Sequence, residues 1–230
     1  MIPIKKIETL KNKIIKECDG CRGNGCISCT IKITKMQSWA DAGVPIIFWD
    51  MNMDNFYGDK DFLEFYKNYI FDLNKTYIDG KSVIIHGNKG TGKTLVSSQI
   101  LKIVLSKKYS ALFTTLDDMI SSISNKQSVA EYKYKIMNTD FIVIDEFDSR
   151  FVSDTLASQN FIGSIFESTI RYRLQNKMPT IICTNNSLDE FNNIFEKTLF
   201  SKTLQSLFNM YASHIIVTGI DFRMKDNNER

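Results

Sequence analysis

The stretch that most constrains the fold is residues 81–94, KSVIIHGNKGTGKT. The apolar residues Val83, Ile84 and Ile85 lead into an octapeptide that matches the pattern G-x-x-x-x-G-K-[ST] at every fixed position. Residues 95–107, which follow, have the composition of a helix. A chance match would be an ordinary glycine-rich turn, whereas a strand before the loop and a helix after it are the context of a phosphate-binding loop. The sequence therefore predicts an α/β fold built around a nucleoside triphosphate site.

Each residue type in the loop has a chemical reason to be there. Glycines let the backbone turn tightly and bring its N–H groups close to phosphate oxygens. Lys93 is predicted to place its ammonium against the β- and γ-phosphates, and Thr94 to offer its hydroxyl to Mg²⁺. The positive N-terminal end of the following helix faces the same anion. The predicted ATP-binding residues are Gly87, Asn88, Lys89, Gly90, Thr91, Gly92, Lys93, Thr94 and Leu95.

A second motif, FIVIDE at residues 141–146, is an apolar run that ends in two acids, as in a Walker B element. Buried parallel strands are continuously apolar, and ligands bind at their carboxyl ends. Asp145 is accordingly predicted to hold Mg²⁺ together with Thr94. Glu146 is predicted to be catalytic, as the general base that polarises the attacking water.

A further apolar strand, predicted at residues 180–184, delivers Asn185 to the same edge of the sheet. A polar amide at this position can contact the γ-phosphate or the attacking water, so Asn185 joins Lys93 and Glu146 as a catalytic candidate. The alternative is an ordinary turn asparagine.

Two C-x-x-C pairs, Cys18/Cys21 and Cys26/Cys29, lie within a dozen residues. Four thiolates can complete a closed tetrahedral shell around Zn²⁺, which leaves no open position and predicts a structural role. So short a segment cannot build its own core, so the metal would supply its folding energy. The alternatives, disulfides or free thiols, are less favoured in a reducing compartment. The fifth cysteine, Cys183, is predicted to be a core residue of its strand.

The chain of 230 residues is predicted to contain one main domain with an appendage. The predicted parts are a zinc-binding module at 1–38, a loop-like linker at 39–60, the ATPase domain at 61–224 and a tail at 225–230. A run of eighteen apolar residues and a secretory signal are both absent, which predicts a cytoplasmic protein without a membrane partner. The formal charge of +3 is too small to argue for nucleic-acid binding by itself.

The order of these motifs resembles AAA+ ATPases, which are P-loop proteins of the ASCE type. More specifically, the chain resembles the helicase loaders of the DnaC and DnaI type, with IstB-like ATP-binding proteins as near relatives. The resemblance covers roughly residues 40–223, and the segments that carry it are AGVP…FWDMNMDNF at 42–56, GNKGTGKT, FIVIDEFD at 141–148 and YRLQNKMPTIICTNN at 172–186. The Lys-, Ile- and Asn-rich composition points to an AT-rich genome, of a phage or a low-GC bacterium.

This resemblance implies a parallel sheet flanked by helices, ATP·Mg²⁺ at a subunit interface, and self-association into a ring or spiral. It also implies single-stranded DNA and a hexameric DnaB-like helicase as partners, with the zinc-type module gripping the helicase. Residues 121–139 occupy the position of the family's DNA-contacting insertion, and the alternative for them is a solvated helix face. The candidates for contacting single-stranded DNA are Lys126, Tyr132, Lys133, Tyr134 and Lys135.

One departure from the family concerns the arginines that reach a neighbour's γ-phosphate. The equivalent stretch, residues 201–206, offers only Lys202, which lacks the guanidinium fork suited to phosphate. Either Lys202 substitutes, or Arg171 or Arg173 acts in trans, or hydrolysis needs another protein. Arg223 lies where the resemblance implies a second nucleotide-sensing arginine.

Three functions follow as hypotheses. The first is an ATPase that loads a replicative helicase, with Mg²⁺-dependent hydrolysis through Glu146, stimulated by DNA or partner, as the switch. The second is an IstB-like transposition helper, against which the zinc-type module argues. The third is a zinc-dependent adaptor whose nucleotide is only structural.

Overall fold

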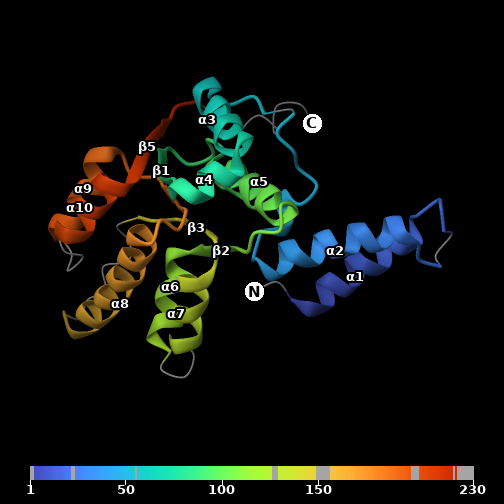
Figure 1. Cartoon of the computed structure of the whole chain (residues 1–230), viewed down its shortest axis with the longest axis horizontal. Coiled ribbons are helices and arrows are strands. Elements are labelled where there is room, and N and C mark those ends of the chain that lie inside the picture. Colours follow the sequence, from blue (N-terminus) through green and yellow to red (C-terminus); the bar gives the residue numbers. More distant parts are fainter. Residues whose placement is uncertain are drawn as a thin grey trace.

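The computed structural model describes residues 3–21, 24–54, 56–125, 129–148, 156–197, 202–219 and 221. Five strands form one sheet in the order β2-β3-β4-β1-β5, and every neighbouring pair is parallel (Figure 1). The strands are β1 (Ser82–Gly87), β2 (Ala111–Thr115), β3 (Phe141–Asp145), β4 (Thr180–Thr184) and β5 (Ala212–Val217). The predicted parallel sheet is confirmed.

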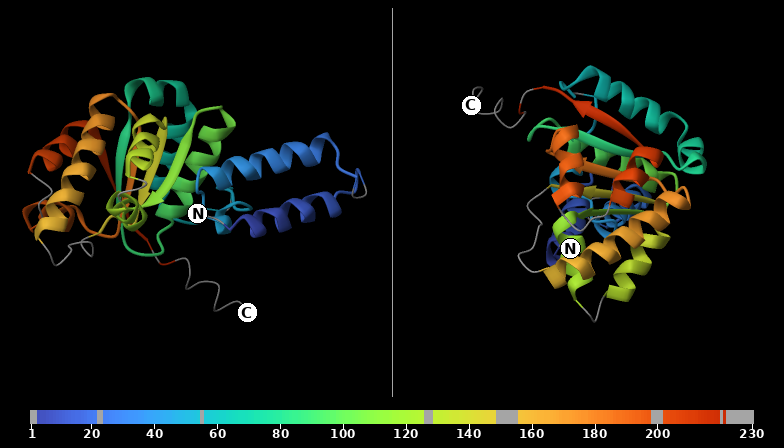
Figure 2. Two further views of the ribbon diagram at one scale, coloured as in Figure 1. Left: turned by 90° about the horizontal axis from the view of Figure 1, so that it is seen from below. Right: turned by 90° about the vertical axis from the view of Figure 1, so that its left-hand side faces the viewer.

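The helices cover both faces of this sheet (Figure 2). Their bounds are α1 (Ile4–Lys16), α2 (Ile27–Asp41), η1 (Ile46–Phe48, a 3-10 turn), α3 (Lys60–Phe71), α4 (Leu73–Asp79), α5 (Lys93–Ser106), α6 (Leu116–Ser124), α7 (Val129–Asn138), α8 (Leu156–Gln175), α9 (Leu188–Lys197) and α10 (Lys202–Tyr211).

Two hydrophobic cores lie on the two faces of the sheet. Because successive side chains of a strand point to opposite faces, Val83 and Ile85 of β1 enter one core and Ile84 enters the other. The first core also contains apolar residues of α3, α4 and α5, and the second those of α6 to α10. The inner strands are therefore buried on both sides, which explains why β1, β3 and β4 are continuous apolar runs in the sequence.

Helices α1 and α2 form an antiparallel hairpin that projects from the sheet domain (Figures 1 and 2). The first residues of the loop-like linker predicted at 39–60 are helical, because α2 continues to Asp41. Its buried residues, Cys29, Met36 and Ala40, lie seven and four positions apart, which is one face of a helix. Contacts with α1 and α5 therefore stabilise a helix whose mixed composition carries little periodic signal.

Lys102 of α5 joins the hairpin to the sheet domain. Its ammonium donates hydrogen bonds to the backbone oxygens of Phe48, Trp49 and Met51 at 3.1, 2.8 and 2.9 Å, and it lies 4.8 Å from the centre of a ring of Trp39. The joint is thus made to the helix that begins at the phosphate loop. A groove of about 1000 Å³ lies beside it, lined by residues of α2, α3 and α5.

Residues 60–79 form two helices, α3 and α4, because Asp72 interrupts the helical run. The Asp72 carboxylate accepts a hydrogen bond from Lys75 N at 2.9 Å and so caps the start of α4.

Within the residues that the structure describes, no helix combines the length and apolar character needed to cross a membrane.

Candidate nucleotide site and metal centre

The phosphate loop runs from the end of β1 to the start of α5, as its sequence context requires. Gly90 and Gly92 have φ angles of 80° and 90°, a left-handed conformation that favours glycine. A Cβ on Gly90 would collide with the carboxylate of Asp221. The segment that follows β5 therefore reaches the phosphate loop, and Arg223, two residues further on, lies outside the described residues.

Lys93, the first residue of α5, is buried, and its ammonium lies across the loop. Its Nζ donates to Gly87 O at 2.6 Å, to Asn88 O at 2.8 Å and to Asn185 Oδ1 at 3.1 Å. The structure thus brings Asn185 at the end of β4 next to the loop lysine, 92 positions earlier in the chain. Because an ammonium only donates, the amide of Asn185 must turn its oxygen to Lys93.

Thr94 and Asp145 meet at the same edge of the sheet. Thr94 Oγ1 donates to Asp145 Oδ2 at 2.7 Å, and the backbone N–H of Glu146 donates to Asp145 Oδ1 at 2.8 Å. Burial raises the pKa of the Asp145 carboxyl, although the bonds from Thr94 and Glu146 and the charge of Lys93 oppose that shift. A hydroxyl and a carboxylate side by side are oxygen ligands of the kind that Mg²⁺ prefers, so these residues fit the ion.

Glu146 is exposed and has a φ of 54°, which is unusual for a residue with a side chain. Among the described residues, Lys108 and Lys177 are the other non-glycine residues with positive φ, and they follow the ends of helices, where this conformation is common. Glu146 instead follows a buried strand, and Phe147 N donates to Cys183 O at 2.9 Å directly after it. Left-handed backbone costs about 1–2 kcal/mol for such a residue, and strain of this kind concentrates at functional sites.

Two histidines that sequence analysis did not connect lie beside this site. His86 precedes Gly87 on β1, and its Nε2 is 2.9 Å from Nδ1 of His214 on β5. From its place at the start of a strand His214 is predicted to be structural, and no role is predicted for His86. The available signal was a histidine inside the apolar run of β1, next to the phosphate loop.

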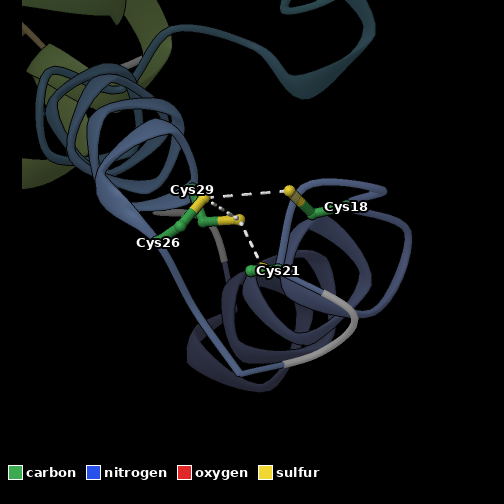
Figure 3. Close-up of side chains that lie close together, drawn as sticks. All are labelled: Cys18, Cys21, Cys26 and Cys29. Atoms are coloured by element: carbon green, nitrogen blue, oxygen red, sulfur yellow. Dashed lines mark hydrogen bonds between the residues drawn. The ribbon is translucent and has the colours of Figure 1, made fainter.

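The four cysteines gather at the tip of the α1–α2 hairpin, with their sulfur atoms turned toward one another (Figure 3). All four Sγ atoms lie within 4.8 Å of one another. The Cys21–Cys29, Cys26–Cys29 and Cys18–Cys26 separations are 3.6, 3.7 and 3.9 Å. Tetrahedral zinc with Zn–S bonds of about 2.3 Å has its sulfur atoms about 3.8 Å apart. The donor set and its spacing therefore fit Zn²⁺.

Arg173, a candidate for acting on a neighbouring subunit, is fully buried in α8. Its guanidinium donates to four backbone oxygens and one hydroxyl of its own chain: Ile136 O, Thr139 O, Asp140 O, Pro179 O and Thr180 Oγ1. It cannot reach another subunit, so the trans-acting prediction is wrong for Arg173. Arg171 is partly exposed and forms an ion pair with Glu167. Lys202 begins α10, but its side chain is outside the described residues.

The candidates for contacting single-stranded DNA fall on and before α7. The Tyr132 hydroxyl is 2.8 Å from Thr114 Oγ1, and its ring packs against the second core, so Tyr132 is a packing residue. Tyr134 is 70% exposed, Lys135 is exposed and Lys133 is half-buried. Lys126 lies outside the described residues.

With this geometry established, comparison with known proteins identifies the family. The sequence profile described as "IstB-like ATP binding protein" matches residues 70–229. The chain belongs to the IstB-like ATP-binding family. No individual curated protein matches the chain.

Solved structures share the fold of this IstB-like protein. The crystal structure of the DnaC helicase loader is similar with a TM-score of 0.62 and 19% identity, over 76% of this chain and 100% of that one. The crystal structure of DnaI gives a TM-score of 0.57 and 16% identity, over 76% and 88% of the two chains. The replication initiator DnaA bound to AMPPCP and single-stranded DNA gives 0.59 and 18%, over 81% and 55%. The IstB-like protein therefore has an AAA+ fold of the DnaC and DnaI type.

Proposed function

We propose that this IstB-like protein is an ATP-dependent loader of a hexameric, DnaB-like replicative helicase, acting in the cytoplasm. ATP hydrolysis switches its affinity for single-stranded DNA and for the helicase. The observation that carries the proposal is the similarity in fold to the DnaC helicase loader, which extends over the whole of that chain. The same edge of the sheet carries the residues that an ATPase of this fold needs.

The residues at this edge of the sheet have separate roles in ATP hydrolysis. The N–H groups of the loop, with Lys93, would bind the phosphates, and Thr94 with Asp145 would hold Mg²⁺. With its oxygen on Lys93, Asn185 presents its amide N–H₂ to the γ-phosphate or to the attacking water. Glu146 accepts the proton of that water. ATP, when bound, would supply the γ-phosphoryl group, which passes to the water as the bond to the β–γ bridging oxygen breaks and ADP leaves; Mg²⁺ would neutralise the developing charge.

The helical hairpin carries the proposed contact with the helicase. Zn²⁺ held by the four cysteines would join the end of α1 to the start of α2 and so stabilise the hairpin. Lys102 of α5, the helix that begins at the phosphate loop, contacts the hairpin through the ring of Trp39 on α2. This contact offers a route by which nucleotide state and client binding influence each other.

Single-stranded DNA is proposed to bind along α7, where Tyr134 and Lys135 are exposed. Self-association into a ring or spiral would place a neighbouring subunit at the nucleotide. Lys202 and Arg171 are the remaining candidates in this chain for the trans-acting charge, and a residue of another protein is the alternative. Asp221 lies beside Gly90 of the phosphate loop, and Arg223, two residues later, is proposed to contact the nucleotide.

The proposal is tested with Glu146→Gln and a control, Glu64→Gln, which makes the same chemical change at an exposed residue of α3. ATP turnover is measured with and without single-stranded DNA and a hexameric helicase, and helicase release is followed in parallel. Glu146→Gln should bind ATP and helicase normally, lose about 100-fold or more in turnover, and fail to release the helicase. Unchanged turnover and release in Glu146→Gln would refute the switching function.

The second candidate is a transposition helper, which the match to the IstB-like family favours. It predicts binding to a transposase and no stable complex with a replicative helicase. The same experiment, run with a transposase in place of the helicase, separates the two. Absence of ATP turnover with every partner present would instead support an adaptor with a structural nucleotide.

A further inference from the structure

A pair of histidines connects β5, β1 and the turn that carries Asn185. The rings of His86 and His214 are nearly parallel, with centroids 5.2 Å apart and planes 19° apart. His86 Nδ1 lies 3.1 Å from the backbone oxygen of Asn186, and His86 Nε2 lies 2.9 Å from His214 Nδ1. We infer that His86 is a positioning residue that holds Asn185 against Lys93, and that His214 orients His86. This inference rests on the proposed ATP hydrolysis.

The hydrogen bonds determine where the protons of the pair lie. The Asn186 oxygen can only accept, so Nδ1 of His86 must carry a proton. Nε2 of a neutral His86 is then an acceptor, and Nδ1 of His214 must donate to it. That leaves Nε2 of His214 as a bare lone pair, and this atom is indeed buried without a partner in the part of the chain described. The bonds therefore run in one direction, from His214 to His86 to the Asn186 oxygen.

The turn that receives the last of these bonds is held on both sides of Asn185. Asn186 N donates to Thr184 Oγ1 at 3.1 Å. Ser187 and Glu190 form a capping box at the start of α9, with bonds of 2.8 and 3.2 Å between side chain and backbone. Without the bond from His86, the Asn186 peptide would lose its link to β1.

His86 also sits on the other side of the catalytic lysine. Its neighbour Gly87 accepts from Lys93 Nζ, and Asn185 accepts from the same Nζ. The side chain of His86 thus joins the two elements between which Lys93 is held. Displacing a catalytic group by about 1 Å can lower the rate about 100-fold, so this link acts on the rate rather than on overall nucleotide binding.

The surroundings keep the pair neutral. Burial lowers the pKa of His86 and outweighs the hydrogen bond to the Asn186 oxygen, which raises it; a positive charge on His214, and that of Lys93, lower it further. Burial also lowers the pKa of His214. The ring of Phe191, 5.3 Å from that of His86, adds no charge. A proton added to His86 at Nε2 would force His214 to carry its own at the buried Nε2, for which the described residues provide no acceptor. Acid should therefore break the pair at pH values below the ordinary histidine pKa of 6.5.

The test compares His86→Leu with His86→Asn, since the amide N–H₂ of asparagine takes the place of Nδ1–H. In His86→Leu, kcat for ATP should fall about 10- to 100-fold with nucleotide Kd within threefold of wild type. His86→Asn should recover most of this loss and lack the fall in kcat below pH 6.5 that wild type shows. His214→Asn, which keeps a donor, should stay close to wild type at neutral pH.

Two outcomes overturn the inference: wild-type kcat in His86→Leu, or equal losses of kcat and stability in His86→Leu and His86→Asn. If His86→Leu does not fold, the test is kcat as a function of pH in His86→Asn and His214→Asn. A fall below pH 6.5 in His86→Asn, or a large loss at neutral pH in His214→Asn, would overturn the inference. Histidine-selective ¹⁵N NMR of the full chain gives a readout without turnover, and it should show Nδ1–H tautomers for both rings. Any other tautomer refutes the inference, whereas a wild-type protein without ATP turnover refutes only the proposed function.

Discussion

Replacing Arg173 by methionine should destabilise the protein more than any change to an exposed arginine. The side chain is fully buried in α8 and joins three elements, the end of α7 and the starts of β3 and β4. Its donors satisfy four backbone oxygens and the hydroxyl of Thr180. Methionine fills a similar volume but donates nothing, so these acceptors lose a partner that water cannot replace.

The expected loss in the free energy of unfolding follows from the hydrogen bonds that are lost and the buried charge that is removed. Pro179 O also accepts from Ile142 N, so three carbonyls carry most of the loss. An unsatisfied buried acceptor costs about 1–3 kcal/mol, which gives a gross loss of about 3–9 kcal/mol. Burial lowers the pKa of Arg173 to about 9, which shows that its charge is poorly solvated and that removing it returns part of this loss. A net cost of about 3–5 kcal/mol is expected.

The assay is urea unfolding followed by circular dichroism, with Arg171→Met as the matched control. Arg171 lies two positions earlier on α8, is partly exposed and pairs only with Glu167 among the described residues, so its loss should cost less than about 1 kcal/mol. Arg173→Lys should fall between the two, because one ammonium cannot span the acceptors of a guanidinium. If Arg173→Met is within about 1 kcal/mol of Arg171→Met, the reasoning about buried acceptors is refuted.

Three further predictions concern the two sites and the DNA surface. Because burial raises the pKa of Asp145, the folded state favours the neutral carboxyl. The free energy of unfolding therefore falls as the pH rises from the unfolded pKa through the folded pKa. Asp145→Asn should therefore raise the free energy of unfolding at pH 7 by about 1 kcal/mol while abolishing the stabilisation by Mg²⁺·ATP, both read from thermal unfolding. Replacing Cys18 and Cys29 by serine should remove one bound Zn²⁺ per chain, measured by metal analysis, and unfold the hairpin, measured by circular dichroism. Nucleotide affinity should stay intact, and retained metal would contradict the zinc assignment. Tyr134→Ala should weaken binding of single-stranded DNA about tenfold in fluorescence anisotropy, and Lys135→Ala should reduce the salt slope by about 0.7, whereas no change in either would exclude this face of α7.

Much of the nucleotide site was predictable because its chemistry is local. The phosphate loop needs its glycines, Lys93 and Thr94 within one octapeptide, and the strands that end at Asp145 and Asn185 are apolar runs of the kind that a doubly covered sheet requires. The rule that parallel strands expose ligand sites at their carboxyl ends was then enough to place these residues at one edge.

The missed features are those whose sequence signal is the same in two different environments. Arg173 in the sequence is a charged residue near the end of a helix, like Arg171, and nothing local distinguishes the buried arginine from the partly exposed one. Tyr132 and Tyr134 alternate on one segment, yet one ring packs on the second core and the other is exposed. The helical continuation of α2 was missed because contacts with α1 and α5, rather than its own composition, stabilise it.

By itself, the sequence determined the phosphate loop, the acid-tipped strand and the cysteine spacing, because a few contiguous residues must supply each of these. Only the tertiary structure decided the partners of polar side chains far apart in the chain. His86 and His214 are 128 positions apart, and they meet because β1 lies beside β5 in the sheet. Strand order depends on the packing of two cores, and a hydrogen bond satisfies a buried group only where that packing brings donor and acceptor within about 3 Å.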